Sequence, residues 1–127
     1  MWRTTMWHFL FIHRFFLACV VLGLSLLATS TQAMTLRELR ALEKNDKQGE
    51  NYVNYYLVGV MEGVLETDAH RVRDGAKPTI CLNGRRLQPS MARSLFDTEL
   101  QRNDGVYEAD MPVQLVLRNA LATVYSC

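Results

Sequence analysis

The sequence predicts an all-α protein, a small bundle of about four helices with one disulfide, following an N-terminal signal peptide. Three observations support this fold class. Apolar residues recur three and four positions apart along four segments. No segment has the alternation of polar and apolar residues that is typical of a half-buried strand. Two cysteines remain once the N-terminal segment is set aside.

Residues 1–33 have the three parts of a secretory signal peptide. MWRTTMWHFLFIHR carries two arginines and no acid, FFLACVVLGLSLLA carries no charge, and small residues lead to Ala33. This order predicts export to the periplasm with cleavage after Ala33, which leaves residues 34–127 as one helical domain. The apolar run is shorter than the roughly 20 residues that span a bilayer, so a retained membrane anchor is the weaker interpretation. Bulky residues before Cys19 also make a lipoprotein the weaker interpretation.

Cleavage changes the charge of the protein. The whole chain has 14 basic and 13 acidic residues. Removal of Arg3 and Arg14 leaves 12 basic residues against all 13 acids, a net charge of −1. This balance gives no electrostatic reason to expect a nucleic-acid partner or, after cleavage, a membrane partner.

Cys81 and Cys127 are the two cysteines of the exported part, and an even pair in an exported chain predicts a disulfide. Loop-closure entropy gives such a bond about 4 kcal/mol of stabilisation. Two cysteines without neighbouring histidines do not suit a metal site, and we expect no cofactor. The bond would clamp the end of the last helix against the loop between the second and third helices.

The first predicted helix covers residues 35–46. Thr35 followed by Glu38 is a capping-box pattern, and Gly49 interrupts the segment that follows the helix. The apolar stripe consists of Leu36, Leu39 and Leu42.

The longest periodic segment, residues 50–70, predicts the central helix. Its apolar face consists of Tyr52, Val53, Tyr56, Leu57, Val60, Met61, Val64 and Leu65. Gly59 and Gly63 interrupt this helix at a cost of roughly 1 kcal/mol each relative to alanine. They suit either a tight helix crossing within the domain or a contact between subunits, and the sequence leaves both open.

Residues 71–89 form the predicted irregular segment, which is rich in basic residues.

A third helix is expected over residues 89–103, with Met91, Leu95, Phe96 and Leu100 on its apolar face. After the turn NDGVYEAD, the last helix is expected to have Asp110 as its cap and Pro112 in its first turn. Its apolar face consists of Val113, Val116, Leu117, Ala120, Leu121 and Val124.

The exported part contains no set of residues that predicts catalysis, so we expect a binding protein and not an enzyme. Its single histidine, His70, suits the C-terminal end of the long helix. Ser90 is placed as a helix-start residue, and no glycine elbow surrounds it. Glu62 and Glu66, followed by Asp68, are best interpreted as a solvated helix face. Tyr55 lies off the apolar stripe and suits a surface anchor.

Four motifs, in order, resemble the Rap/Tai family of type VI secretion immunity proteins. They are YYLVGVMEGV, ICLN, SLFDTEL and the terminal PVQLVLRNALATVYSC, and together they cover roughly residues 50–127. Asn83 stands where proline is common in that family, and Ser126 stands where proline often precedes the last cysteine. The segment NDGVYEAD also differs from common versions of the family.

The resemblance implies a periplasmic homodimer that blocks an injected peptidoglycan amidase by occluding its active site. The motifs shared with the family consist of core residues and the disulfide cysteines, so they do not identify the surface that contacts the toxin. Candidate residues for toxin binding are Tyr55, His70, Arg71, Arg73, Asp74, Lys77, Tyr107, Glu108 and Asp110. A periplasmic holdase chaperone and an orphan binding protein are the alternatives. A single histidine and nearly balanced charge argue against an acid-activated chaperone, and a neighbouring gene for a cysteine–histidine amidase would favour immunity.

Overall fold

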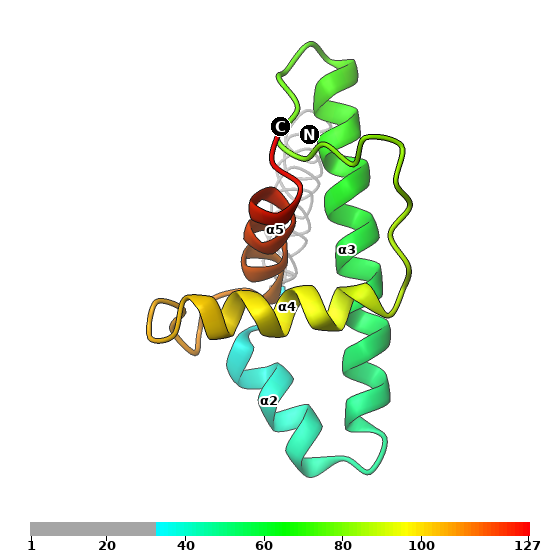
Figure 1. Ribbon diagram of the computed structural model, residues 1–127. Coiled ribbons are helices and arrows are strands. Elements are labelled where there is room, and N and C mark those ends of the chain that lie inside the picture. Colours follow the sequence, from blue (N-terminus) through cyan, green and yellow to red (C-terminus); the bar gives the residue numbers. More distant parts are fainter. Residues whose placement is uncertain (1–32) are drawn as a thin grey trace, which may run out of the picture. The chain divides into compact units, whose positions relative to one another are not determined.

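The computed structural model describes residues 33–127, which fold into four α-helices (Figure 1). The helices are α2 (Leu36–Asn45), α3 (Gly49–Arg73), α4 (Met91–Arg102) and α5 (Val113–Val124). Within this described part, the only β-type pairings are two isolated bridges, Thr35 with Pro112 and Ile80 with Ser126. The predicted all-α fold class is confirmed. The predicted signal peptide lies outside the described residues, apart from Ala33.

Helix α2 begins with the predicted capping box. The amide of Glu38 donates to Thr35 Oγ1 at 3.2 Å, and the amide of Thr35 donates to Glu38 Oε2 at 2.7 Å. This backbone bond is the largest cause of the lowered pKa of the Glu38 carboxyl. The helix that follows buries Leu36 and Leu39 in the core.

The turn from α2 to α3 depends on Gly49. A Cβ at this position would clash with the carbonyl group of Leu42, so the close approach of the two backbones requires glycine. From Gly49, α3 continues to Arg73, beyond the predicted end at residue 70. His70, Arg71 and Arg73 therefore lie in the last turn of α3, where cations interact favourably with the helix dipole. The prediction that Arg71 and Arg73 belong to a loop is wrong.

The core lies where α4 crosses α3 and α5, both of which it contacts (Figure 1). Most of the predicted apolar faces are buried, but Tyr52 and Val124 are not. Tyr52 is 53% exposed because it lies about 100° around the helix from Val53, on the solvent side of the stripe. Val124 is 46% exposed, and the neighbouring Tyr125 is buried in its place. The largest fully buried side chains are Phe96, Leu36, Leu39, Leu57, Leu117, Leu121, Val53, Val113 and Val116.

Helix α5 starts without the predicted aspartate cap. Its N-cap residue is Pro112, and no side chain makes a capping hydrogen bond there. The segment before α5 pairs with the start of α2: Leu36 N donates to Met111 O at 3.0 Å and Arg37 N donates to Ala109 O at 2.7 Å. These bonds hold the chain away from helical conformation until Val113, so Asp110 remains exposed and outside the cap.

Candidate functional site

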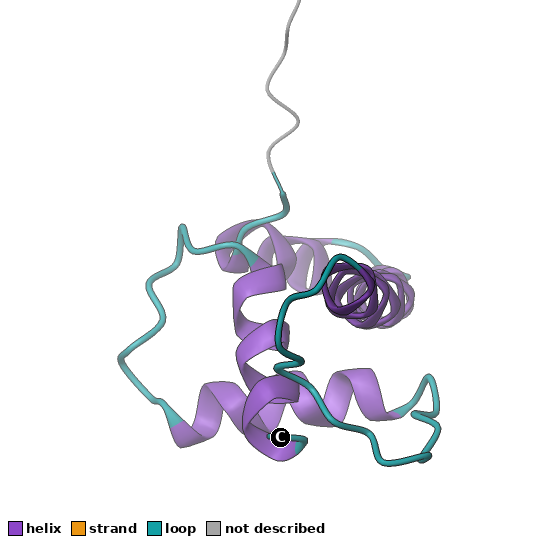
Figure 2. Ribbon diagram, turned by 90° about the horizontal axis from the view of Figure 1, so that it is seen from above, coloured by secondary structure: helices purple, strands orange, loops and turns teal. Residues whose placement is uncertain are grey.

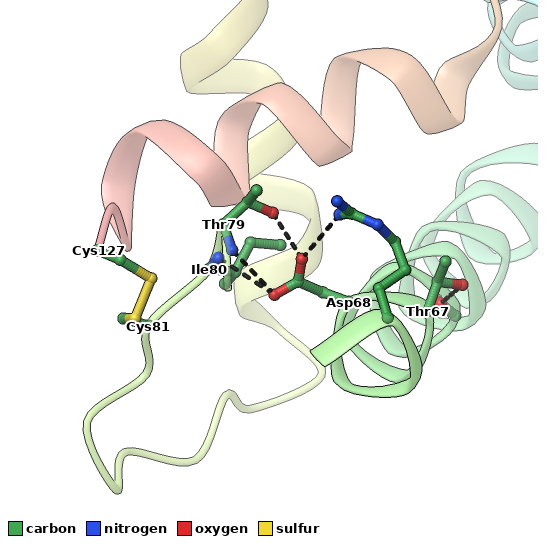
Figure 3. Close-up of polar contacts among 8 residues, drawn as sticks. Thr67, Asp68, Thr79, Ile80, Cys81 and Cys127 are labelled. Carbon is green, nitrogen blue, oxygen red and sulfur yellow. Dashed lines mark hydrogen bonds and ion pairs between the residues drawn. A yellow bond between two sulfur atoms is a disulfide. The ribbon is translucent and has the colours of Figure 1, made fainter. Parts of the chain in front are cut away.

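A buried carboxylate fixes the loop that leaves α3. Asp68 is 7% exposed, and Thr79 Oγ1 donates to its Oδ1 at 2.6 Å (Figure 3). The amides of Thr79 and Ile80 donate to its Oδ2 at 3.3 Å each, and Arg71 pairs with Oδ1 at 3.3 Å. The Thr79 hydroxyl, followed by the two amides and Arg71, lowers the pKa of Asp68 in spite of its burial. The ionised carboxylate thus organises the first half of the loop.

The interpretation of Asp68 as part of a solvated face is wrong. Glu62 and Glu66 are exposed, and Glu66 pairs with Arg73 at 2.8 Å, which lowers the pKa of Glu66. Asp68, in contrast, follows Met61 by seven positions, so it lies in phase with the buried stripe. This spacing is the sequence signal that could have identified a buried carboxylate.

The predicted disulfide joins the loop to the end of the chain. The Cα atoms of Cys81 and Cys127 lie 5.0 Å apart, and the two sulfur atoms are bonded at 2.00 Å (Figure 3). The amide of Cys81 also donates to Tyr125 O at 2.7 Å. Figure 2 looks along α3 and shows the loop crossing to the end of α5, where the chain ends. The loop between α3 and α4 is therefore clamped at its middle, as the sequence predicts.

An exposed tight turn follows directly after the disulfide. In this 82–86 turn, Arg85 N donates to Leu82 O at 3.0 Å, and the two central residues have positive φ angles, 52° at Asn83 and 77° at Gly84. Such angles are typical of a type I′ turn, for which Asn-Gly is a preferred pair. The Arg85 guanidinium lies 5.3 Å from the centre of the Tyr125 ring. Because proline is fixed near a φ of −65°, it could not replace Asn83 in this conformation.

A groove of about 760 Å³ lies between α3 and α5. Tyr55, Gly59, Gly63 and Arg118 are among its lining residues, and the lining is mostly apolar. Gly59 and Gly63 are exposed, and a Cβ at either position would meet no heavy atom of residues 33–127 within 4 Å. The interpretation of these glycines as a tight crossing within the domain is therefore wrong. Among residues 33–127, no helix packs against them.

A polar contact joins α3 and α5 beside the groove. Gln114 on α5 donates through Nε2 to the hydroxyl of Tyr56 on α3 at 3.1 Å. Burial is the largest cause of the raised pKa of Tyr56. Tyr55, the next residue on α3, is 78% exposed at the groove. The two neighbouring tyrosines thus differ in role: Tyr56 ties the helices together, and Tyr55 points to solvent.

Tyr107 has an internal role that the sequence did not predict. Its hydroxyl donates to Glu99 Oε1 at 2.7 Å and accepts from Asn119 Nδ2 at 3.1 Å. Glu99 is only 3% exposed, and Asn103 and Arg102 also donate to its carboxylate. Burial is the largest cause of the raised pKa of Tyr107. Its neighbours Glu108 and Asp110 are exposed.

Of the remaining candidate residues, Arg71 lines the groove together with Tyr55, whereas His70, Arg73, Asp74 and Lys77 do not. His70 and Asp74 pair at 3.0 Å near the exposed end of α3, and Lys77 is exposed in the loop beyond them. Tyr55 lies fifteen residues before His70 on the same helix, roughly 22 Å away by helical rise.

Within residues 33–127, no group of three or more histidine, cysteine or acidic side chains could hold a metal ion.

None of the helices described for this chain combines the length and the apolar character needed to cross a membrane. No protein-family model matches the sequence, and no curated protein or solved structure matches it either.

Proposed function

We propose that the protein is a periplasmic immunity protein that binds a peptidoglycan amidase toxin of a type VI secretion system and occludes its active site. Two kinds of support carry the proposal. The motifs YYLVGVMEGV, ICLN, SLFDTEL and the terminal segment resemble the Rap/Tai immunity proteins. The structural observation that supports it is the 82–86 turn, an exposed projection with a rigid base.

Inhibition by occlusion favours a projection that is already in its binding conformation, because little conformational entropy is then lost on binding. The base of the 82–86 turn is held at two places. Asp68 binds Thr79 and Ile80 before it, and the bond from Cys81 to Cys127 fixes the residue that directly precedes it. The loop therefore presents its tip with limited freedom.

The tip offers polar groups to a protein surface. Asn83 and Arg86 are exposed, and Arg86 makes no ion pair among residues 33–127. Arginine is enriched among the residues that dominate binding energy at protein interfaces. Arg85 instead packs its guanidinium over the Tyr125 ring, so it links the turn to the end of α5. We therefore assign toxin contact to Asn83 and Arg86 ahead of the other exposed candidates.

The proposal is tested by titrating the exported, purified protein into peptidoglycan amidase toxins, including any encoded beside its gene, while hydrolysis of purified sacculi is followed. We expect complete inhibition at about one inhibitor per amidase. Arg86→Glu should weaken inhibition at least about tenfold, as loss of a central arginine contact does. Lys77→Glu makes the same charge change in the same loop, away from the turn, and should have little effect.

Failure to inhibit any amidase of the panel would overturn the proposal. A protein that instead suppresses the aggregation of unrelated denatured proteins would support the chaperone alternative. An Arg86→Glu variant that inhibits as well as the unmodified protein would remove the 82–86 turn from the contact.

A further inference from the structure

The groove between α3 and α5 carries one positive charge that the described domain does not neutralise. Arg118 lines the groove from α5, is exposed, and makes no ion pair among residues 33–127. Arg71, the other arginine of the lining, pairs with the buried Asp68 at 3.3 Å. These three are the charged residues that line the groove within the described part of the chain. Because two guanidinium groups face one carboxylate, the groove attracts an anion.

The neutral polar side chains of the lining mostly make hydrogen bonds inside the domain. Thr67 Oγ1 donates to a carbonyl oxygen of its own helix at 2.7 Å, and Thr79 Oγ1 donates to Asp68 at 2.6 Å. Gln114 Nε2 donates to the hydroxyl of Tyr56 at 3.1 Å. The backbone groups of both walls are bonded within helices. The groove therefore offers a ligand apolar contact along most of its length and a charged contact at Arg118.

The groove is elongated along the helices. Its lining extends from Tyr55 to Thr67 on α3, about 18 Å by helical rise, and α5 runs beside α3 in the same direction (Figure 1). Gln114 on α5 contacts Tyr56 near the start of the groove. Arg118 comes one helical turn after Gln114, so it lies part of the way along the groove.

This shape and lining suit an alkyl chain. The apolar part of the lining includes Val60, Val64 and Ile80. An extended peptide beside these residues would bury backbone amides that find no hydrogen-bond partner in helical walls. An α-helix is about 10 Å across with its side chains, which is too wide for about 760 Å³ spread over this length. An alkyl chain has no polar group to leave unpaired, and the volume is typical of a small-molecule site.

We infer that the groove binds a long-chain fatty acid, with its carboxylate at Arg118 and its alkyl chain along the apolar wall toward Ile80. A guanidinium group binds a carboxylate through two parallel N–H···O bonds, and burial of the chain adds affinity with each methylene group. None of the residues of the 82–86 turn lines this groove. The inference therefore does not depend on the proposed toxin.

The test is isothermal titration calorimetry of the purified protein with dodecanoate at pH 7. We expect one dodecanoate per chain, and decanoate should bind more weakly because it buries fewer methylene groups. Dodecan-1-ol has the same chain without the charge and should bind at least about tenfold more weakly. Arg118→Gln should weaken dodecanoate binding by at least about tenfold and leave dodecan-1-ol binding unchanged. Arg86→Gln removes an exposed arginine outside the groove and should bind dodecanoate normally.

Gly63→Leu tests the position of the alkyl chain. A leucine side chain would occupy the groove, so this variant should bind dodecanoate at least about tenfold more weakly. The domain should remain folded, since leucine favours helix more than glycine and no heavy atom of residues 33–127 lies within 4 Å of a Cβ placed there. Ala69→Leu, exposed on α3 but outside the groove, is the matched control and should bind dodecanoate normally.

Absence of saturable dodecanoate binding would overturn the inference, as would binding that Arg118→Gln and Gly63→Leu both leave unchanged. Dodecan-1-ol that binds as tightly as dodecanoate would overturn the assignment of an anionic ligand. If dodecanoate did not bind but Gly63→Leu abolished amidase inhibition, the groove would belong to the toxin contact instead. Amidase inhibition is measured separately, so failure of dodecanoate to bind would leave the proposed function standing.

Discussion

Asp68 and Thr79 are joined by a 2.6 Å hydrogen bond between a buried carboxylate on α3 and a hydroxyl eleven residues further along the chain. Because the same carboxylate accepts from the amides of Thr79 and Ile80, it determines how the loop leaves the helix. The exposed turn that we propose to contact the toxin depends on this arrangement.

Replacement of Asp68 by asparagine should lower the free energy of unfolding by about 2 kcal/mol, the usual contribution of hydrogen bonds to a charged group. The reason is that the asparagine NH2 group would replace one of the two carboxylate oxygens that now accept hydrogen bonds from the loop and from Arg71. Urea denaturation at pH 7 measures the change. Glu62→Gln, an exposed control on the same helix, should change stability by less than about 0.5 kcal/mol. Equal effects of the two substitutions would contradict the assignment.

The contribution of Asp68 should depend on pH. Its pKa in the folded protein is lowered, chiefly by the Thr79 hydroxyl, while an unfolded aspartate titrates near about 3.9. The stabilisation is therefore present above about pH 4 and is lost as the pH falls through the folded pKa. The stability difference between the unmodified protein and Asp68→Asn should shrink over that range. A difference that stays constant down to pH 2 would show that the charge is not responsible.

Replacement of Cys81 and Cys127 by serine should lower the free energy of unfolding by about 4 kcal/mol through loss of loop closure. Chemical denaturation measures this loss. The unmodified protein, denatured without reductant, should have no thiol in residues 34–127 that reacts with a thiol reagent. Detection of two reactive thiols there would refute the bond. Reduction followed by alkylation provides the matched sample with the natural sequence.

The 82–86 turn should tolerate glycine but not proline at position 83. Asn83→Gly keeps the positive φ angle of 52° accessible, whereas Asn83→Pro excludes it. We expect the proline variant to inhibit the amidase at least about tenfold more weakly while its helical circular dichroism is unchanged, and the glycine variant to inhibit normally. Normal inhibition by both variants would mean that the conformation of the turn is unimportant for toxin binding.

Tyr107→Phe should cost about 2 kcal/mol of stability, because it removes a hydrogen bond to the buried Glu99 carboxylate and one from Asn119. Thermal and urea denaturation measure the effect. Tyr52→Phe makes the same chemical change at an exposed position and should be nearly neutral. If Tyr107→Phe instead abolished amidase inhibition without affecting stability, Tyr107 would belong to the toxin contact.

Local patterns predicted the elements of the fold well. The pair Thr35 and Glu38 identified the start of α2, because a capping box depends only on residues three positions apart. The disulfide was predictable because only two cysteines remain in residues 34–127. Helix α3 extends past the predicted end at residue 70, because its last turn consists mainly of basic residues and has Val72 as its one apolar residue. The sequence predicts Asp110 as the cap of α5, but the residues on both sides of it form backbone hydrogen bonds with the start of α2, so Asp110 does not cap the helix.

The candidate site was less predictable, because it depends on which helix faces pack against other helices and which remain exposed. Gly59 and Gly63 are recognisable in the sequence as unusual, but only the structure shows that no other part of residues 33–127 packs against them. Tyr107 looked like a surface residue because it lies in the turn between α4 and α5, and its partners, Glu99 and Asn119, lie on those two helices. Asp68 had a detectable signal in its spacing, yet its partners are eleven and twelve residues away.

The bond between Cys81 and Cys127 makes a covalent ring that contains α4 and α5 and excludes α2 and α3. A protease that cuts the exposed Asp104–Gly105–Val106 segment would open this ring without dividing the molecule in two. The nicked protein would keep a single mass under non-reducing conditions and would release α4 from α5 only after reduction. After one backbone break there, the disulfide still joins the two parts of the chain.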